Sequence, residues 1–214
     1  MTTGKFIDHP MQRQGLIMCV CGPSGVGKGT LISGLLSRVP NVFLSISMTT
    51  RQPRGTEKDG VEYYFCDHQE FEERLARKDI LEYDIYLGNY YGTPASPIRQ
   101  RVARGQNVIL DITLAGAFQV KNMFPDAIMV FLLPPDMMTL ERRLIERGTE
   151  AHDVIKQRMI EARREIREAI QFDYVIINDT IQKSVDRLES ILIAESCRRE
   201  RQPNIVEEML RQDD

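Results

Sequence analysis

The chain has 214 residues, of which 42% are hydrophobic and 28% are charged, and its formal net charge is −3. This composition is typical of a globular protein with one lobed domain or two small ones, and it gives no overall attraction to nucleic acid or to an anionic membrane. No apolar run approaches the roughly 20 residues that cross a bilayer, and the polar start, Met1 to Gln14, is not expected to be a secretory signal.

The chain contains four cysteines without metal-ligand spacing, and three histidines. We therefore expect reduced thiols, packed as small hydrophobic groups in a cytoplasmic protein, and neither a zinc site nor a His-based triad.

A glycine-rich loop follows an apolar run that ends at Cys21. It reads Gly22-Pro23-Ser24-Gly25-Val26-Gly27-Lys28-Gly29-Thr30, and apolar residues at helical spacing follow it. A strand, a glycine turn and a helix together favour a phosphate site, because backbone N–H groups and the helix N-terminus face the anion and Lys28 adds a charge. The alternative is a strand–helix turn with an exposed lysine. Gly29 occupies the place of the usual Mg²⁺-binding hydroxyl, which leaves Thr30 to reach the metal through water or to face the helix interior.

The downstream pattern alternates strands with helices. It predicts strands over 41–47, 61–65, 80–86, 89–92, 108–111, 128–133 and 174–177, and helices over 68–78, 97–103, 114–123, 137–146 and 181–195, with Asp136 capping the fourth helix and a short amphipathic helix near 205–210. Such a pattern is typical of an α/β fold whose parallel sheet is covered on both faces and binds ligands beyond the carboxyl ends of its strands.

Two segments interrupt this rhythm, a strand-rich block at about 47–95 and a polar, arginine-rich stretch at about 142–171. We expect both to lie over the glycine-rich loop. The prediction is a single domain over 1–214, in which the core comprises about 15–46, 96–141 and 172–197, and 198–214 form a tail.

The strand-rich block carries Arg51 and Arg54, three residues apart. Hydroxyl side chains accompany them at Ser47, Tyr63, Tyr91 and Thr93. Guanidinium groups bind phosphate through two parallel hydrogen bonds, so this set suits a monophosphate. The alternative is an exposed loop whose arginines pair with Glu57 or Asp59. Glu82, within an apolar run, either accepts two hydrogen bonds from an edge such as that of guanine or faces outward.

Three ordered segments resemble the guanylate kinase family. They are Ser47 to Phe65, read S-M-T-T-R-Q-P-R-G-T-E-K-D-G-V-E-Y-Y-F, then Gly88 to Thr93, and Arg147 to Glu150. With the glycine-rich loop, the resemblance runs from about Gly15 to about Ala194. It implies Mg²⁺-dependent transfer of a phosphoryl group from ATP to GMP in purine nucleotide metabolism. It also implies small-molecule partners only, without nucleic acid or membrane, and leaves the oligomeric state undecided.

The resemblance also implies residue roles. Positions matching Arg51, Arg54, Tyr63 and Tyr91 hold the GMP phosphate, and those matching Ser47, Glu82 and Thr93 contact guanine, so 47–95 would be a GMP-binding insertion. The glycine-rich loop, Arg143, Arg147 and Asn178 would bind ATP, and 142–171 would form a lid. The catalytic residues would be Lys28, Arg51, Arg147 and Arg158. GMP would also be bound by Arg158 and Asp111. Mg²⁺ would be reached through water by Thr30 and Asp111. Arg163, Arg164 and Arg167 are expected on a solvated helix face with Glu161, Glu165 and Glu168 as partners.

One motif departs from the family. Where the family usually reads D-I-D followed by glutamine and glycine, this chain reads Asp111-Ile112-Thr113-Leu114-Ala115-Gly116. Loss of a charged acceptor predicts weaker discrimination for guanine, without loss of activity. Two other functions stay open: a kinase-like module that holds a phosphorylated peptide, opposed by Lys28 and the lid arginines, and a kinase for another small phosphorylated substrate, opposed by Ser47 and Glu82.

Overall fold

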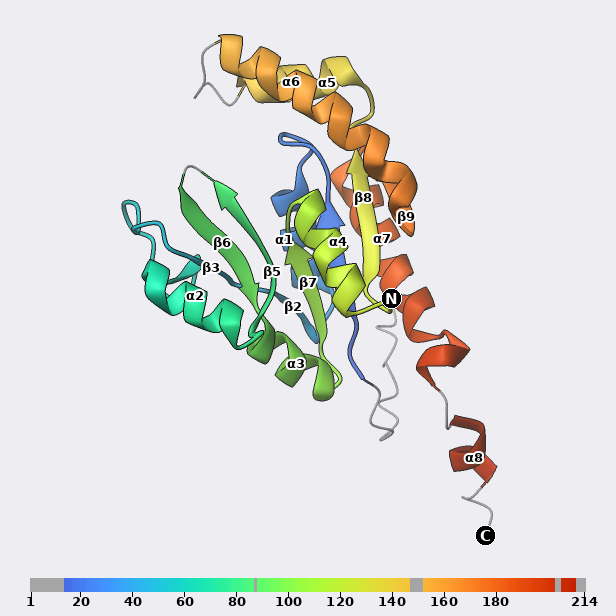
Figure 1. Cartoon of the computed structure of the whole chain (residues 1–214). Coiled ribbons are helices and arrows are strands. Elements are labelled where there is room, and N and C mark those ends of the chain that lie inside the picture. Colours follow the sequence, from blue (N-terminus) through green and yellow to red (C-terminus); the bar gives the residue numbers. More distant parts are fainter. Residues whose placement is uncertain (1–13, 87, 147–151, 203–204, 211–214) are drawn as a thin grey trace.

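Two sheets organise the chain (Figure 1), seen in a computed structural model that describes residues 14–86, 88–146, 152–202 and 205–210. The larger sheet has five parallel strands in the order β2-β7-β1-β8-β9. Their bounds are Ile17–Cys21 for β1, Val42–Leu44 for β2, Asn107–Asp111 for β7, Ile128–Leu133 for β8 and Tyr174–Ile177 for β9. The central strand β1 is paired on both sides, with Ile17 opposite Val108 and Met18 opposite Ile128.

Helices cover both faces of this sheet, which confirms the α/β fold predicted from the sequence. Every residue of β1 is buried, as expected for an inner parallel strand. Alternate side chains enter different layers: Met18 and Val20 pack with α1 (Lys28–Arg38) and α7 (Ile181–Ser196), whereas Cys19 and Cys21 pack with α3 (Ala95–Ala103) and α4 (Leu114–Met123). The carboxyl end of β1, from which the glycine-rich loop departs, is therefore held from both sides.

A smaller mixed sheet of four strands lies beside the first, in the order β4-β3-β6-β5. Its strands are β3 (Ser47–Thr49), β4 (Tyr63–Phe65), β5 (Ile80–Tyr86) and β6 (Asn89–Pro94). Helix α2 (His68–Ala76) covers one face, where the ring of Phe71 stacks on that of Tyr90 at 4.8 Å and packs with Met48 and Ile80. The opposite face is left to the pocket described below.

The strand predicted over 41–47 is wrong as a single element. Its first part is β2 of the large sheet, and its last residue begins β3 of the small sheet. The Ser45 N–H still donates to the Ile109 carbonyl of the large sheet at 2.9 Å, so the chain changes sheets across Ser45 and Ile46. Periodicity does not reveal such a change, because both halves are extended.

The remaining helices are α5 (Met137–Glu146), α6 (His152–Arg167), α8 (Ile205–Leu210) and the 3₁₀ turns Glu168–Gln171 and Arg199–Arg201. The predicted cap of α5 is confirmed, since the Thr139 N–H donates to Asp136 Oδ1 at 2.7 Å. Helices α5 and α6 lie beyond the carboxyl end of β8, and α8 lies at the opposite side of the molecule (Figure 1). Among the described helices, none is both long and apolar enough to pass through a bilayer.

The cysteines confirm the sequence prediction in part. Cys19 and Cys21 are buried and Cys66 is half-buried, but Cys197 is exposed, so the expectation that all four pack as hydrophobic groups is wrong for this residue. Cys197 is the C-cap of α7, where the helix leaves the core.

Candidate functional site

The glycine-rich loop turns tightly between β1 and α1. Gly22 and Gly27 have φ angles of 148° and 101°, in the region that favours glycine. A Cβ atom at Gly27 would lie 2.8 Å from Nδ2 of Asn178, and one at Gly22 would lie 2.6 Å from the carbonyl oxygen of Leu132. Backbone conformation and close packing thus both require glycine at these two positions.

Side chains from distant elements fix the outside of this loop. Asn178 Nδ2 and Arg143 Nη1 donate to the carbonyl of Val26 at 2.7 and 3.1 Å, and Arg143 Nη2 donates to the Asn178 carbonyl at 3.4 Å. Inside the loop, Lys28 Nζ donates to the Gly22 carbonyl at 2.7 Å. Arg158, on α6, donates to Ser24 Oγ at 2.6 Å. These four side chains therefore hold the loop in shape.

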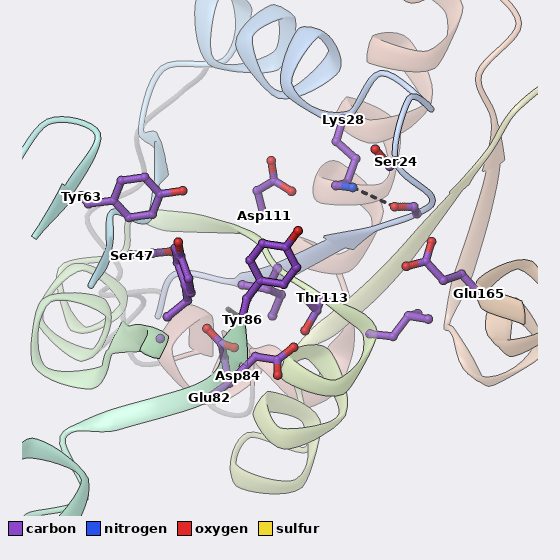
Figure 2. Close-up of a pocket in the computed structure, with 15 residues that line it drawn as sticks. Ser24, Lys28, Ser47, Tyr63, Glu82, Asp84, Tyr86, Asp111, Thr113 and Glu165 are labelled. Atoms are coloured by element: carbon purple, nitrogen blue, oxygen red, sulfur yellow. Dashed lines mark hydrogen bonds between the residues drawn. The ribbon is translucent and has the colours of Figure 1, made fainter. Parts of the chain in front are cut away.

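A pocket of about 420 Å³ separates the glycine-rich loop from the small sheet (Figure 2). Its lining comprises Gly22, Ser24 and Lys28 of the loop region, Ser47, Tyr63, Glu82, Asp84, Tyr86, Tyr91 and Gly92 of the small sheet, Asp111, Ile112, Thr113 and Leu114 at the end of β7, and Glu165 of α6. Lys28 and the small-sheet residues thus face one space, although they come from elements far apart in the sequence.

The predicted site residues divide into three groups. Those lining the pocket are Gly22, Ser24, Lys28, Ser47, Tyr63, Glu82, Tyr91 and Asp111. Those absent from its lining are Pro23, Gly25, Val26, Gly27, Gly29 and Thr30 of the loop, with Arg51, Arg54, Thr93, Arg143, Arg158 and Asn178. Arg147 lies outside the described residues, as does the rest of the Arg147 to Glu150 motif.

Arg51 is the centre of a cluster of charged and aromatic groups. Its guanidinium makes two hydrogen bonds of 2.9 Å to the carboxylate of Glu57 and lies 5.3 Å from the centre of the Tyr63 ring. The rings of Tyr91 and Tyr63 pack in a T-shaped arrangement, with their centres 6.0 Å apart. Glu57, followed by Tyr91, raises the pKa of Arg51, and Arg51 in turn holds the pKa of Glu57 below its ordinary value. The pairing with Glu57 that the sequence allowed is thus present, but Arg51 is only 9% exposed, so it is not a solvated loop residue.

Arg54 differs from Arg51. Its backbone N–H donates to Glu57 Oε2 at 2.7 Å, whereas its side chain is exposed. Glu57 therefore orders the loop that carries both arginines.

Glu82 faces inward, which rules out the outward orientation that its sequence context allowed. The residue is 5% exposed, and its carboxyl accepts a hydrogen bond of 2.5 Å from the hydroxyl of Thr93, a fully buried residue. Burial raises the pKa of Glu82, and the Thr93 hydrogen bond opposes that shift. Gly116 at the start of α4 leaves room for this carboxyl, because a Cβ there would overlap Glu82 Oε2.

The residue at which this chain departs from the family motif is a helix cap. Thr113 is the N-cap of α4, and its hydroxyl accepts a hydrogen bond of 3.2 Å from the Gly116 N–H. Thr113 therefore keeps a capping role while it adds only a neutral hydroxyl to the pocket.

Two carboxyl groups lie at the core side of the pocket. Asp111 is exposed to the pocket, and desolvation by the surrounding protein raises its pKa while Lys28 opposes the shift. Glu165 is half-buried, and its pKa is raised in the same way. The sequence-based expectation that Glu165 pairs with arginines on a solvated face is wrong, because α6 turns this residue toward the pocket. Arg164 forms the expected ion pair with Glu161, at 3.5 Å.

Sequence reasoning therefore missed Asp84, Tyr86 and Glu165. Alternation along the strand predicted over 80–86 would have placed Asp84 and Tyr86 on the same face as Glu82. Nothing in the arginine-rich segment distinguishes Glu165 from its charged neighbours.

The donor atoms present fit a magnesium ion that is held mainly by phosphate and water. Within the part of the chain that the structure describes, no three Asp, Glu, His or Cys side chains form a metal cluster. Asp111 offers a carboxylate in the pocket, and Thr30 offers a hydroxyl in the first turn of α1. Mg²⁺ commonly uses one or two carboxylates plus substrate phosphates, so this sparse set is sufficient.

Comparisons with known proteins agree on one family. The family model described as guanylate kinase matches residues 14–195. A guanylate kinase of Desulfitobacterium hafniense is 45% identical over 194 residues, which cover 91% of this chain and 97% of the relative. One of Carboxydothermus hydrogenoformans is 46% identical over 188 residues, covering 88% and 92%. The crystal structure of guanylate kinase from Anaplasma phagocytophilum superimposes with a TM-score of 0.70 at 32% identity and covers 87% of this chain and 88% of that one. This chain belongs to the guanylate kinase family.

Proposed function

We propose that this protein transfers the terminal phosphoryl group of ATP to GMP, giving ADP and GDP, with Mg²⁺ as its cofactor. The observation that carries the proposal is the shared pocket: Lys28 and the glycine-rich loop face Ser47, Tyr63 and Glu82 of the small sheet across one space. Two phosphate-binding regions that face each other are what phosphoryl transfer requires, because the reaction depends on positioning and charge neutralisation. The reaction belongs to purine nucleotide metabolism, and we place it in the cytoplasm.

On the donor side, the backbone N–H groups of the glycine-rich loop bind the ATP phosphates, and Lys28 moves its ammonium group from the Gly22 carbonyl to the β- and γ-phosphates. Arg143 and Asn178 keep the loop in shape. Arg158 and Arg147, in the proposed lid over 142–171, add positive charge around the transferred group. Asp111 and Thr30 would hold Mg²⁺ through water, and the bound ion would neutralise charge on the ATP phosphates.

On the acceptor side, the proposed GMP-binding insertion spans 47–95. Arg51, Arg54, Tyr63 and Tyr91 bind the GMP phosphate, and Ser47, Glu82 and Thr93 hold guanine. Because Glu82 Oε1 already accepts the Thr93 hydroxyl, the carboxylate is fixed toward the base. An oxygen of the GMP phosphate attacks the γ-phosphorus. The new O–P bond forms as the bond from the γ-phosphorus to the bridging oxygen breaks, and ADP leaves with that oxygen.

An assay of ADP release with a panel of acceptors tests this function. We expect ATP- and Mg²⁺-dependent ADP release with GMP, weak release with AMP or UMP, and none with ribose phosphates. Absence of any GMP-dependent signal in folded protein would instead support a binding module. A preference for another acceptor would identify a different kinase on the same scaffold.

A further inference from the structure

Asp84 lines the pocket, but none of the roles proposed above uses it. It lies on β5 between Glu82 and Tyr86, which also line the pocket, and Figure 2 shows Glu82 and Asp84 on the side of the pocket away from Lys28, with the Tyr86 ring reaching into the middle of the view. Tyr83, between them, turns to the other face of the sheet, where its ring lies 6.4 Å from that of Phe71. Alternation along the strand therefore directs Asp84 into the nucleotide space.

The backbone of β5 fixes the position of Asp84. On the outer edge of the strand, Gln119 of α4 accepts from the Tyr83 N–H at 3.1 Å and donates to the Tyr83 carbonyl at 3.0 Å. On the inner edge, β6 pairs Asp84 directly with Tyr91. The carboxyl itself is exposed, and its one hydrogen bond to the described residues is local, from the Ile85 N–H at 2.8 Å. Across the described ranges, no lysine or arginine forms an ion pair with it.

The register places Asp84 between the two ends of the proposed nucleotide site. Glu82 and Thr93 form the base end, two residues back along β5. Tyr91, opposite Asp84, belongs to the phosphate end with Tyr63 and Arg51. Residues two apart on a strand are separated by about 6.5 Å, so Asp84 lies one side-chain step from the base end in the direction of the phosphate end. The ribose of a mononucleotide lies between its base and its phosphate, so it reaches the level of Asp84.

The chemistry of a carboxylate selects the group that it contacts. An ionised carboxylate only accepts hydrogen bonds, and it repels a phosphate. The N–H groups of guanine lie at Glu82, so the donors left at the level of Asp84 are the ribose hydroxyls. We infer that Asp84 accepts hydrogen bonds from the ribose 2′ and 3′ hydroxyls, and so makes the enzyme selective for GMP over 2′-deoxy-GMP. This inference rests on the proposed function.

The test measures kcat and KM for GMP, 2′-deoxy-GMP and IMP with the wild type, Asp84→Ala and Asp84→Asn. We expect the wild type to have a kcat/KM for GMP about tenfold above that for 2′-deoxy-GMP, as for a hydrogen bond to a charged group. Asp84→Ala should bring that ratio near one by raising the KM for GMP, with little change in kcat. Asp84→Asn, which keeps an acceptor without charge, should lie between the two. The ratio of GMP to IMP should not change, because these acceptors differ only in the 2-amino group of the base.

The control is Glu72→Gln, which removes a carboxylate from an exposed position on α2 outside the pocket lining and should leave both ratios unchanged. Melting temperatures of all variants verify folding, and the exposure of Asp84 makes loss of the fold unexpected. An active wild type that treats GMP and 2′-deoxy-GMP alike would overturn the inference, and so would an Asp84→Ala variant that alters the ratio of GMP to IMP instead. Failure of the proposed function gives a different result, namely no GMP-dependent ADP release by the wild type.

Discussion

One side of the pocket presents mainly backbone groups to a ligand, and the other presents mainly side chains. The glycine-rich loop presents backbone groups, and its shape is fixed by φ angles and by hydrogen bonds from Asn178, Arg143 and Lys28 to loop carbonyls. The small sheet presents side chains that already pair with one another, Arg51 with Glu57 and Thr93 with Glu82. A backbone site recognises any phosphate chain, whereas a side-chain site can be tuned to one acceptor. Substitutions on the first side should therefore act mainly on turnover, and those on the second mainly on KM and selectivity.

The largest effect is expected for Lys28→Ala. This change removes the mobile charge from the glycine-rich loop but leaves the small sheet intact, so kcat should fall about a thousandfold with little change in the affinity for GMP. Steady-state kinetics and direct binding of GMP measure the two quantities. Lys183→Ala, at an exposed position on α7, is the matched control. Near-normal turnover of the Lys28 variant would contradict the mechanism.

Glu82→Gln tests the base end. The variant loses a charged acceptor, so the KM for GMP should rise about thirtyfold. In the wild type, burial raises the pKa of Glu82 above its ordinary value of 4.5, and the KM for GMP should therefore fall as the pH rises through that raised pKa. The variant should lack this pH dependence.

The same substitution should stabilise the folded protein, although it weakens the binding of GMP. The folded pKa of Glu82 is raised, so its contribution to the free energy of unfolding is present below the unfolded pKa and is lost as the pH rises through the folded pKa. Glu82→Gln should consequently gain in melting temperature relative to the wild type as the pH rises from 4.5 through the raised pKa. A parallel pH dependence of the two proteins would show that the carboxyl titrates normally.

Arg51→Lys separates charge from geometry at the phosphate end. Lysine keeps the charge but cannot reproduce the two parallel hydrogen bonds that Arg51 makes to Glu57, or those to a phosphate. We expect the KM for GMP to rise about tenfold, with a smaller change in the KM for ATP. Arg77→Lys, at the exposed C-cap of α2, controls for the substitution itself. Equal effects on both substrates would mean that Arg51 is not specific to the acceptor side.

Thr113→Asp restores the carboxylate that the family usually carries. Aspartate is as good an N-cap as threonine, so the hydrogen bond from the Gly116 N–H should persist and the variant should fold. The preference for GMP over AMP in kcat/KM should increase about fivefold. Thr180→Asp adds the same group at the N-cap of α7, away from the pocket, and should have no such effect. Unchanged GMP and AMP kinetics would show that Thr113 does not weaken the discrimination for guanine.

The smallest effect is expected for Gly29→Ser. No heavy atom lies within 4 Å of a Cβ built at Gly29, and serine favours a helix over glycine, so the free energy of unfolding should rise by about 0.5 kcal/mol. Gly27→Ser is the contrast, because its φ of 101° and the nearby Asn178 should make the change destabilising. Chemical denaturation compares the two. A loss of stability in the Gly29 variant would mean that the start of α1 needs glycine.

Much of the fold could be predicted from the sequence because local patterns and packing agree there. The apolar run ending at Cys21 and the run over Ile128–Leu133 are inner strands, and Asp136 caps its helix as the spacing predicts. The functional site was harder to predict from the sequence than the fold. Resemblance indicated Glu82 and Tyr91, but the inward turn of Glu165 depends on how α6 lies over the core, and the pairing of Arg51 with Glu57 depends on a loop conformation that spacing alone does not define.

The small sheet is joined to the core by only two chain crossings. One is the pair Ser45 and Ile46 between β2 and β3, and the other is the junction of Pro94 with Ala95, where β6 passes directly into α3. Proline fixes its own φ, here −61°, so the second crossing is stiff and the first has more rotational freedom. Gln119 of α4 also binds both backbone groups of Tyr83, so a rotation of the small sheet about these two joints would have to break those hydrogen bonds or move α4 with it.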